Sequence, residues 1–132
     1  MPSPNGIVAD KNTIFVASIP ADYKTVNEDN VIYVIKNKNK PKLKRFNDTP
    51  GLYDGLGISK DGKTLYVSDW QTASVKAINL KTKEEKTIYH EKNIGPADIT
   101  TTGNLLLIPD MLNHRIIIYN LKHDSIKIIE SF

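Results

Sequence analysis

The chain has 132 residues, a length typical of one domain, with 39% hydrophobic residues, 25% charged residues and a net charge of +3. It contains no cysteine, which excludes disulfides, thiolate metal sites and cysteine nucleophiles. No apolar run approaches the ~20 residues that span a bilayer, and the N-terminus lacks the basic and apolar regions of a signal peptide. We therefore expect a soluble protein with no membrane partner.

The first unit of the chain predicts four short strands. Residues 5–18 (NGIVADKNTIFVAS) contain two of them, separated by a polar turn, and residues 31–37 (VIYVIKN) and 41–46 (PKLKRF) supply the others. The middle strands have apolar side chains at consecutive positions, as strands buried on both faces do. The lysines at 38, 40, 42 and 44 alternate along the fourth strand, which is typical of a solvated outer edge. We expect no nucleic-acid partner, because interleaved aromatics and a wider basic patch are missing.

The hairpin of the first unit recurs twice. Residues 54–69 (DGLGISKDGKTLYVSD) and 97–110 (ADITTTGNLLLIPD) repeat its pattern at spacings of 49 and 43 residues. Strand-only repeats of this length predict propeller blades. We place the three blades at about 4–48, 53–90 and 95–132, so the predicted fold is all-β, with three four-stranded antiparallel blades.

Three blades do not close a ring, since propellers typically need four to eight. The chain is therefore expected to be a propeller fragment or a half-ring. Its partner would be a second half-propeller, either in a longer version of the same chain or in a homodimer, and two copies would make six blades.

Residues 57–64 (GISKDGKT) match the phosphate-binding pattern G-x-x-x-x-G-K-[ST] letter for letter. That pattern requires a helix directly after the loop, whose free N–H groups meet the phosphates. Here the following residues, LYVSDW, are aromatic and β-branched and predict a strand instead. The match is better explained as a hairpin turn, and ATP or GTP binding is disfavoured.

Residues 4–18 (PNGIVADKNTIFVAS) and 53–70 (YDGLGISKDGKTLYVSDW) resemble the six-bladed SMP-30/gluconolactonase/LRE-like propellers, which are related to paraoxonases. The third unit, residues 95–121, looks more like an NHL repeat. The resemblance implies a divalent metal, usually calcium, on the ring axis. An Asn in an NG pair and an Asp in a DG pair one blade later would hold it, and Asn5 and Asp54 match them. The Glu that the resemblance also implies has no counterpart here.

The direction of the strands places Asn5, Asp54 and Asp98 near the axis on one face of the ring. We predict these three residues as metal ligands, and Asp54 also as the catalytic group that orients or deprotonates water while the metal polarises a carbonyl. The alternative is that Asn-Gly and Asp-Gly only shape a turn, and that Asp98 caps the turn between two blades.

Further candidates lie on loops of the same face. Trp70, Asp110 and His114 are predicted as a possible pocket rim. Trp70 could equally pack between blades, His114 could be a solvated loop residue, and Asp110, like Asp69, could bond to the turn that follows its strand.

Two functions of different classes remain open at this point. One is a calcium-dependent hydrolase of the lactonase type, or an inactive relative of one. The other is a noncatalytic, NHL-like propeller whose face binds a ligand or a protein. The sequence does not decide between an enzyme and a scaffold.

Overall fold

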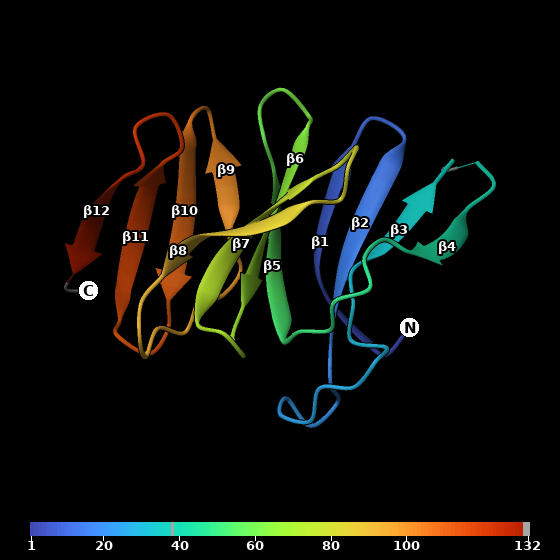
Figure 1. The fold of residues 1–132 in the computed structure, drawn as a ribbon, viewed down its shortest axis with the longest axis horizontal. Helices are drawn as coiled ribbons and strands as arrows, with labels where there is room; N and C mark the ends of the chain where they lie inside the picture. The colour runs from blue at the N-terminus through green and yellow to red at the C-terminus, as the bar shows by residue number, and fades with distance from the viewer. Residues whose placement is uncertain (38, 131–132) are drawn as a thin grey trace.

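The computed structural model describes residues 1–37 and 39–130, and within them the chain forms strands and no helix (Figure 1). Three separate four-stranded sheets follow one another along the chain, and within each sheet every strand pairs antiparallel with its neighbour in sequence. The predicted all-β fold with three four-stranded antiparallel blades is confirmed. None of the described residues forms a helix long and apolar enough to cross a membrane.

The twelve strands of the described chain fall four to a blade. Blade 1 contains β1 (Ser3–Asp10), β2 (Thr13–Ile19), β3 (Tyr33–Lys36) and β4 (Lys42–Arg45). Blade 2 contains β5 (Tyr53–Ile58), β6 (Thr64–Asp69), β7 (Ser74–Asn79) and β8 (Glu85–His90). Blade 3 contains β9 (Thr100–Thr102), β10 (Leu105–Asp110), β11 (Arg115–Asn120) and β12 (Ser125–Glu130). Lys38, predicted on the outer edge of blade 1, lies outside the described residues, as do residues 131–132.

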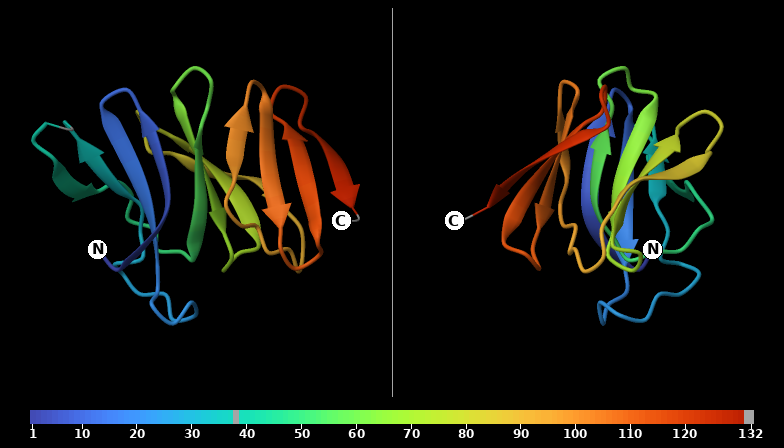
Figure 2. Two further views of the ribbon diagram at one scale, coloured as in Figure 1. Left: turned by 180° about the vertical axis from the view of Figure 1, so that it is seen from behind. Right: turned by 60° about the vertical axis from the view of Figure 1, so that its left-hand side comes forward.

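The blades are arranged like neighbouring sectors of a ring. The first strands of the blades, β1, β5 and β9, contact one another in that order, while β4, β8 and β12 form the outer edges (Figures 1 and 2). The middle blade is covered on both faces. One apolar core, which includes Phe15, Ile32 and Leu65, joins it to blade 1, and a second core, which includes Tyr66, Leu106 and Ile117, joins it to blade 3.

Each outer blade has one sheet face that no other described strand covers. On β10, Leu106 and Ile108 are buried toward blade 2, and the alternate residues point the other way. We call this other side of blade 3 the trailing face. Its apolar residues are Leu105, Leu107, Pro109, Ile116, Ile118 and Ile129, and the ladder pairs Leu107 with Ile118 and Pro109 with Ile116.

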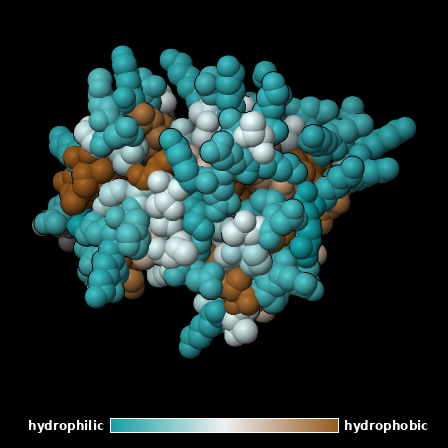
Figure 3. All heavy atoms as spheres, in the orientation of Figure 1, coloured by the Kyte–Doolittle hydropathy of each residue, from teal (hydrophilic) through white to brown (hydrophobic). Residues whose placement is uncertain are grey.

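The uncovered side of blade 1 is also apolar, and we call it the leading face. Its residues are Ile7, Ile14, Val16, Ile35 and Leu43, which meet across the β1–β2, β2–β3 and β3–β4 ladders. Val16 is only 5% exposed, whereas the other four are partly or fully exposed. Ile7 is 66% exposed, and hydrophobic side chains also gather over β12 at the other end of the molecule (Figure 3). Both ends of the blade array therefore present apolar sheet faces to solvent.

Candidate functional site

The phosphate-binding match does not form a phosphate-binding loop. Gly57 lies inside β5, residues 59–63 form a turn, and Thr64 begins β6, so a strand follows where a helix would be needed. The Asp61 carboxylate accepts the backbone N–H of Lys63 at 3.0 Å and thereby stabilises the turn. The turn also lies at the opposite end of the strands from Asn5 and Asp54 (Figures 1 and 2).

Asn5-Gly6 and Asp54-Gly55 both lie at irregularities in strand pairing. The register of β1 on β2 shifts between Pro4 and Ile7, and that of β5 on β6 shifts between Tyr53 and Leu56. Such β-bulges redirect side chains and are frequent beside functional sites. The two oxygen-bearing side chains are thus set by the same local distortion in successive blades.

The two glycines are needed because the inner strands approach each other closely. A Cβ on Gly6 would collide with the carbonyl oxygen of Asp54, and a Cβ on Gly55 would collide with the backbone nitrogen of Ile99. The expectation that the Asn-Gly and Asp-Gly pairs shape a turn therefore has to be corrected. Both pairs lie within strands, and their glycines serve the contact between blades.

Asp54 is the centre of a small polar cluster, which we call the axial cluster and define as Asn5, Asp54 and Asp98. The side chain of Asn5 donates from Nδ2 to Asp54 Oδ1 at 3.2 Å. On the other side of the carboxylate, Trp70 donates from Nε1 to Asp54 Oδ2 at 3.0 Å. Each carboxylate oxygen thus accepts one side-chain hydrogen bond, from a different element in each case.

Burial of the carboxyl raises the pKa of Asp54 above its ordinary value. The hydrogen bond from Trp70 acts in the opposite direction, the negative charge of Asp98 adds to the increase, and the hydrogen bond from Asn5 again lowers the pKa. A half-buried carboxylate with a raised pKa can take up a proton more readily than an exposed one, which is what a general base requires.

Asp98 lies next to Asn5 and Asp54, but at a different position in the repeat. The β9–β10 register aligns Ala97 with Asn5 and Asp54, and Asp98 with the two glycines. Its side chain is exposed, and it acts on Asp54 through its charge. Blade 3 therefore contributes a carboxylate to the axial cluster from Asp98, one residue after Ala97, which is the equivalent of Asn5 and Asp54.

Ser68 is a residue of this region that the sequence reasoning missed. Its hydroxyl accepts the backbone N–H of Gly55 at 2.8 Å and donates to the carbonyl of Ala97 at 2.8 Å. This buried bridge fixes β5 against the segment that carries Asp98. A serine within an apolar strand was the only sequence signal for it.

Asp69 and Asp110 have structural surroundings. Asp69 accepts the backbone N–H groups of Leu52 and Gln71 and pairs with the Lys76 ammonium at 2.9 Å. Asp110 accepts the N–H of Gly95 and pairs with Arg115 at 2.8 Å. Both carboxylates are buried and bond to the segment between blades and to the turn after their own strand.

The pKa of Asp110 reflects this bonding. Burial alone would raise the pKa of the carboxyl, but the hydrogen bonds from Gly95, Asn113 and Arg115 outweigh burial and lower it. Since Asp110 is only 1% exposed and faces into the blade, it does not line a pocket mouth.

Trp70 makes a packing contact and a polar contact. The indole packs over Gly95, where an added Cβ would lie 2.7 Å from Trp70 Cη2, and its N–H still reaches Asp54. His114 is exposed in the turn between β10 and β11, with a φ of 52°. The β6–β7 and β10–β11 turns lie at the end of the blades where β5 begins (Figures 1 and 2). Of Trp70 and His114, Trp70 is the one that donates a hydrogen bond to Asp54.

The axial cluster can offer one amide and two carboxylate groups to a cation. These are the hard oxygen donors that Ca²⁺ and Mg²⁺ prefer, but Ca²⁺ takes six to eight of them. Among the described residues, no group of three or more His, Cys, Asp or Glu side chains is arranged to hold a metal ion. The chain therefore provides donors that fit part of a calcium shell and not a full one.

No protein-family model and no curated protein matches the chain. Solved structures do resemble it: a gluconolactonase from Xanthomonas campestris (TM-score 0.77, 15% identity, 95% of this chain and 46% of that chain) and the calcium-binding protein regucalcin from Agrobacterium tumefaciens (0.74, 14%, 90% and 42%). The WD40 β-propeller domain of Doa1 is also similar, with a TM-score of 0.74 at 9% identity, over 98% of this chain and 41% of that chain.

These similarities establish the fold and leave the subfamily open, since a gluconolactonase, a calcium-binding protein and a WD40 domain match about equally well. The chain spans less than half the length of each of these three structures. Its three sheets are therefore blades of the β-propeller fold, as the repeats predict.

Proposed function

We propose that the axial cluster forms part of a divalent-cation site, with calcium as the expected ion, in a hydrolase that acts on lactones or related esters. The observation that carries the proposal is the contact between Asn5 and Asp54, two oxygen-bearing side chains from different blades. The structural similarity to a gluconolactonase and to a calcium-binding protein supports it. A bound divalent cation supplies Lewis acidity toward the carbonyl of an ester or lactone.

The protein's own groups have distinct tasks in this proposal. Asn5, Asp54 and Asp98 bind the cation through oxygen atoms, and Asp54 also orients a water molecule or accepts a proton from it. The raised pKa of Asp54 favours its role as a proton acceptor, and the Trp70 N–H holds the carboxylate in place. Because three donors do not complete a calcium shell, the remaining ligands have to come from the other half of the ring.

A second copy of the chain is the half-propeller that we propose as partner. Blade 1 covers blade 2, and blade 2 covers blade 3, in each case with one apolar sheet face against another. The trailing face of blade 3 lacks such a neighbour among the described residues, and the leading face of blade 1 is the matching unoccupied surface. Two copies joined head to tail at both ends would give six blades.

Calorimetric titration with CaCl₂ tests the proposed cation site. The assembled protein is expected to bind calcium, and Asp54→Asn to weaken binding by at least about tenfold through loss of a charged ligand. Asp61→Asn is the matched control, since Asp61 is exposed at the opposite end of the blades. Hydrolysis of a panel of small lactones, measured on the same variants, tests the activity separately.

The noncatalytic scaffold remains the second candidate, favoured by the incomplete donor set of the described residues. Under this alternative, the assembled wild-type protein binds no calcium and hydrolyses no lactone. Calcium binding without hydrolysis would support the cation site and contradict the enzymatic part of the proposal.

A further inference from the structure

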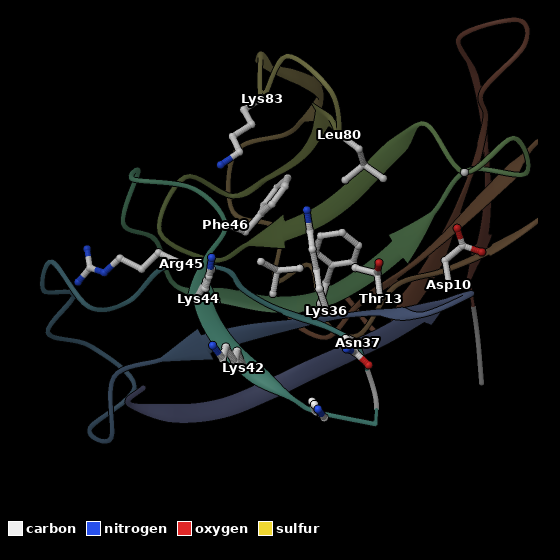
Figure 4. A pocket seen from close by; sticks show the side chains of 14 residues that line it. Asp10, Thr13, Lys36, Asn37, Lys42, Lys44, Arg45, Phe46, Leu80 and Lys83 are labelled. Atoms are coloured by element: carbon white, nitrogen blue, oxygen red, sulfur yellow. The ribbon is translucent and has the colours of Figure 1, made fainter.

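A cavity lies away from the axial cluster, between the outer parts of blades 1 and 2 (Figure 4). It has a volume of about 700 Å³. One acidic residue, Asp10, contributes to its lining, together with six basic residues: Lys36, Lys40, Lys42, Lys44, Arg45 and Lys83. We call this hollow the basic cavity.

The fold gathers these cations from both blades. Lys36 pairs with Lys42 across the β3–β4 ladder, and Lys44 pairs with Val34, whose side chain is buried toward blade 2. Since residues directly opposite each other share a sheet face, these lysines face blade 2 rather than the free edge of β4. From the other side, the Lys83 ammonium lies 5.4 Å from the centre of the Phe46 ring.

The charges of the basic cavity are poorly compensated within the chain. Arg45 pairs with Asp29, and its side chain points away from the lysines of the cavity (Figure 4). No carboxylate among residues 1–37 and 39–130 forms an ion pair with Lys36, Lys42 or Lys44. Like charges placed directly opposite each other destabilise a sheet. Protection of an outer edge explains lysines on β4, but not their convergence with Lys83 from the neighbouring blade.

We propose that the basic cavity binds a small anion that carries two or more phosphate groups. Phosphate oxygens accept hydrogen bonds from several ammonium groups at once, and the anion would relieve the repulsion between Lys36 and Lys42. The floor is apolar, formed in part by Phe46 and Leu80, and suits a compact organic portion of the ligand.

A nucleic acid fits this cavity less well. Binding of single strands depends on aromatic rings that are free to stack with bases. Phe46 is only 6% exposed and Phe15 only 5%, so neither offers an open stacking surface. Of residues 57–64, only Gly62 is among the residues that line the cavity, and the phosphate-pattern lysine, Lys63, is not, so the proposal does not depend on Lys63.

Calorimetry with inorganic triphosphate at fixed ionic strength tests the proposal. The variant Lys42→Gln/Lys44→Gln/Lys83→Gln is expected to bind triphosphate at least about tenfold more weakly than wild type, because each of the three substitutions removes a charge-assisted hydrogen bond to the anion. The control Lys24→Gln/Lys92→Gln/Lys122→Gln changes net charge equally but uses exposed lysines outside the cavity. It is expected to retain wild-type affinity.

Thermal denaturation supplies a second reading. Triphosphate is expected to raise the melting temperature of wild type and of the control, and not that of the cavity variant. Equal weakening of both triple variants would show nonspecific charge attraction and overturn the proposal, as would the absence of triphosphate binding to wild type. Asp54→Asn is expected to leave triphosphate binding unchanged, which separates this site from the axial cluster.

Discussion

The Nδ2 atom of Asn5 lies 3.2 Å from Oδ1 of Asp54, although the two residues are 49 positions apart and belong to different blades. Each lies within a shift in strand register, and each precedes a glycine that lets the next blade approach. The packing of one blade against the next therefore brings the side chains of Asn5 and Asp54 together. This relationship connects the stability of the blade array with the proposed cation site.

The raised pKa of Asp54 predicts a pH-dependent effect of Asp54→Asn on stability. Between the ordinary pKa of 3.8 and the raised value in the folded protein, the folded state binds more protons than the unfolded state. The contribution of Asp54 to the free energy of unfolding therefore falls as pH rises through that interval. Asp54→Asn should gain stability relative to wild type over the same interval, as urea denaturation at a series of pH values would show. A difference in stability between Asp54→Asn and wild type that does not change with pH would contradict a raised pKa of Asp54 in the folded protein.

Gly55→Ala is expected to disrupt the contact between blades 2 and 3. Its added Cβ would collide with the backbone of Ile99 and Asp98, which cannot rotate away as a side chain could. We expect a loss of about 2–4 kcal/mol in the free energy of unfolding, as for other overpacked positions. Gly103→Ala is the control, because it meets no atom within 4 Å and carries only the cost of its φ of +56°. Equal losses for both variants would refute the packing explanation.

Much of the fold follows from the sequence alone. Consecutive apolar residues bounded by polar turns predict the middle strands, and alternating strand direction predicts that Asn5 and Asp54 share one end of the array. The bulges at these positions could not be predicted, because a register shift depends on the pairing of two strands. For the same reason, the sequence offers a turn as the alternative explanation of Gly6 and Gly55, whereas both glycines are constrained by a neighbouring blade.

The candidate sites were less predictable than the fold. The hydrogen bond from Trp70 to Asp54 depends on how the β6–β7 turn folds back, and no spacing in the sequence indicates it. Of the lysines expected on an outer strand, Lys42 and Lys44 lie on β4, whereas Lys40 lies in the segment before it. The meeting of Lys42 and Lys44 with Lys83, which is distant in sequence, becomes visible only when two blades pack together.

Removal of the Asp69 carboxylate is expected to destabilise blade 2 strongly. Asp69 and Lys76 are both buried, and their ion pair measures 2.9 Å. Asp69→Ala leaves the lysine without its main partner and should cost about 3–5 kcal/mol in the free energy of unfolding. Asp69→Ala/Lys76→Met should cost less than Asp69→Ala alone, because no charge is then buried. Guanidinium denaturation of both variants measures this, and a larger cost for the double variant would contradict the interpretation.

Leu107→Asp is expected to prevent association through the trailing face without unfolding the chain. Leu107 lies beside Ile118 on that face and is only half-buried, so a charge there remains accessible to water in the free chain. In a dimer the same charge would be buried against an apolar surface, at a cost of several kcal/mol. Met111→Asp, which changes an exposed side chain outside both end faces, is the control. Circular dichroism should show an unchanged strand content for both.

The molar mass in solution tests the half-ring account most directly. Size-exclusion chromatography with light scattering should give the wild-type chain twice the 14.8 kDa of one copy, and Leu107→Asp a mass of 14.8 kDa. A folded wild-type chain that remains at 14.8 kDa at every concentration would contradict closure by a second copy. It would also remove the source of the missing ligands for the cation site at Asn5 and Asp54.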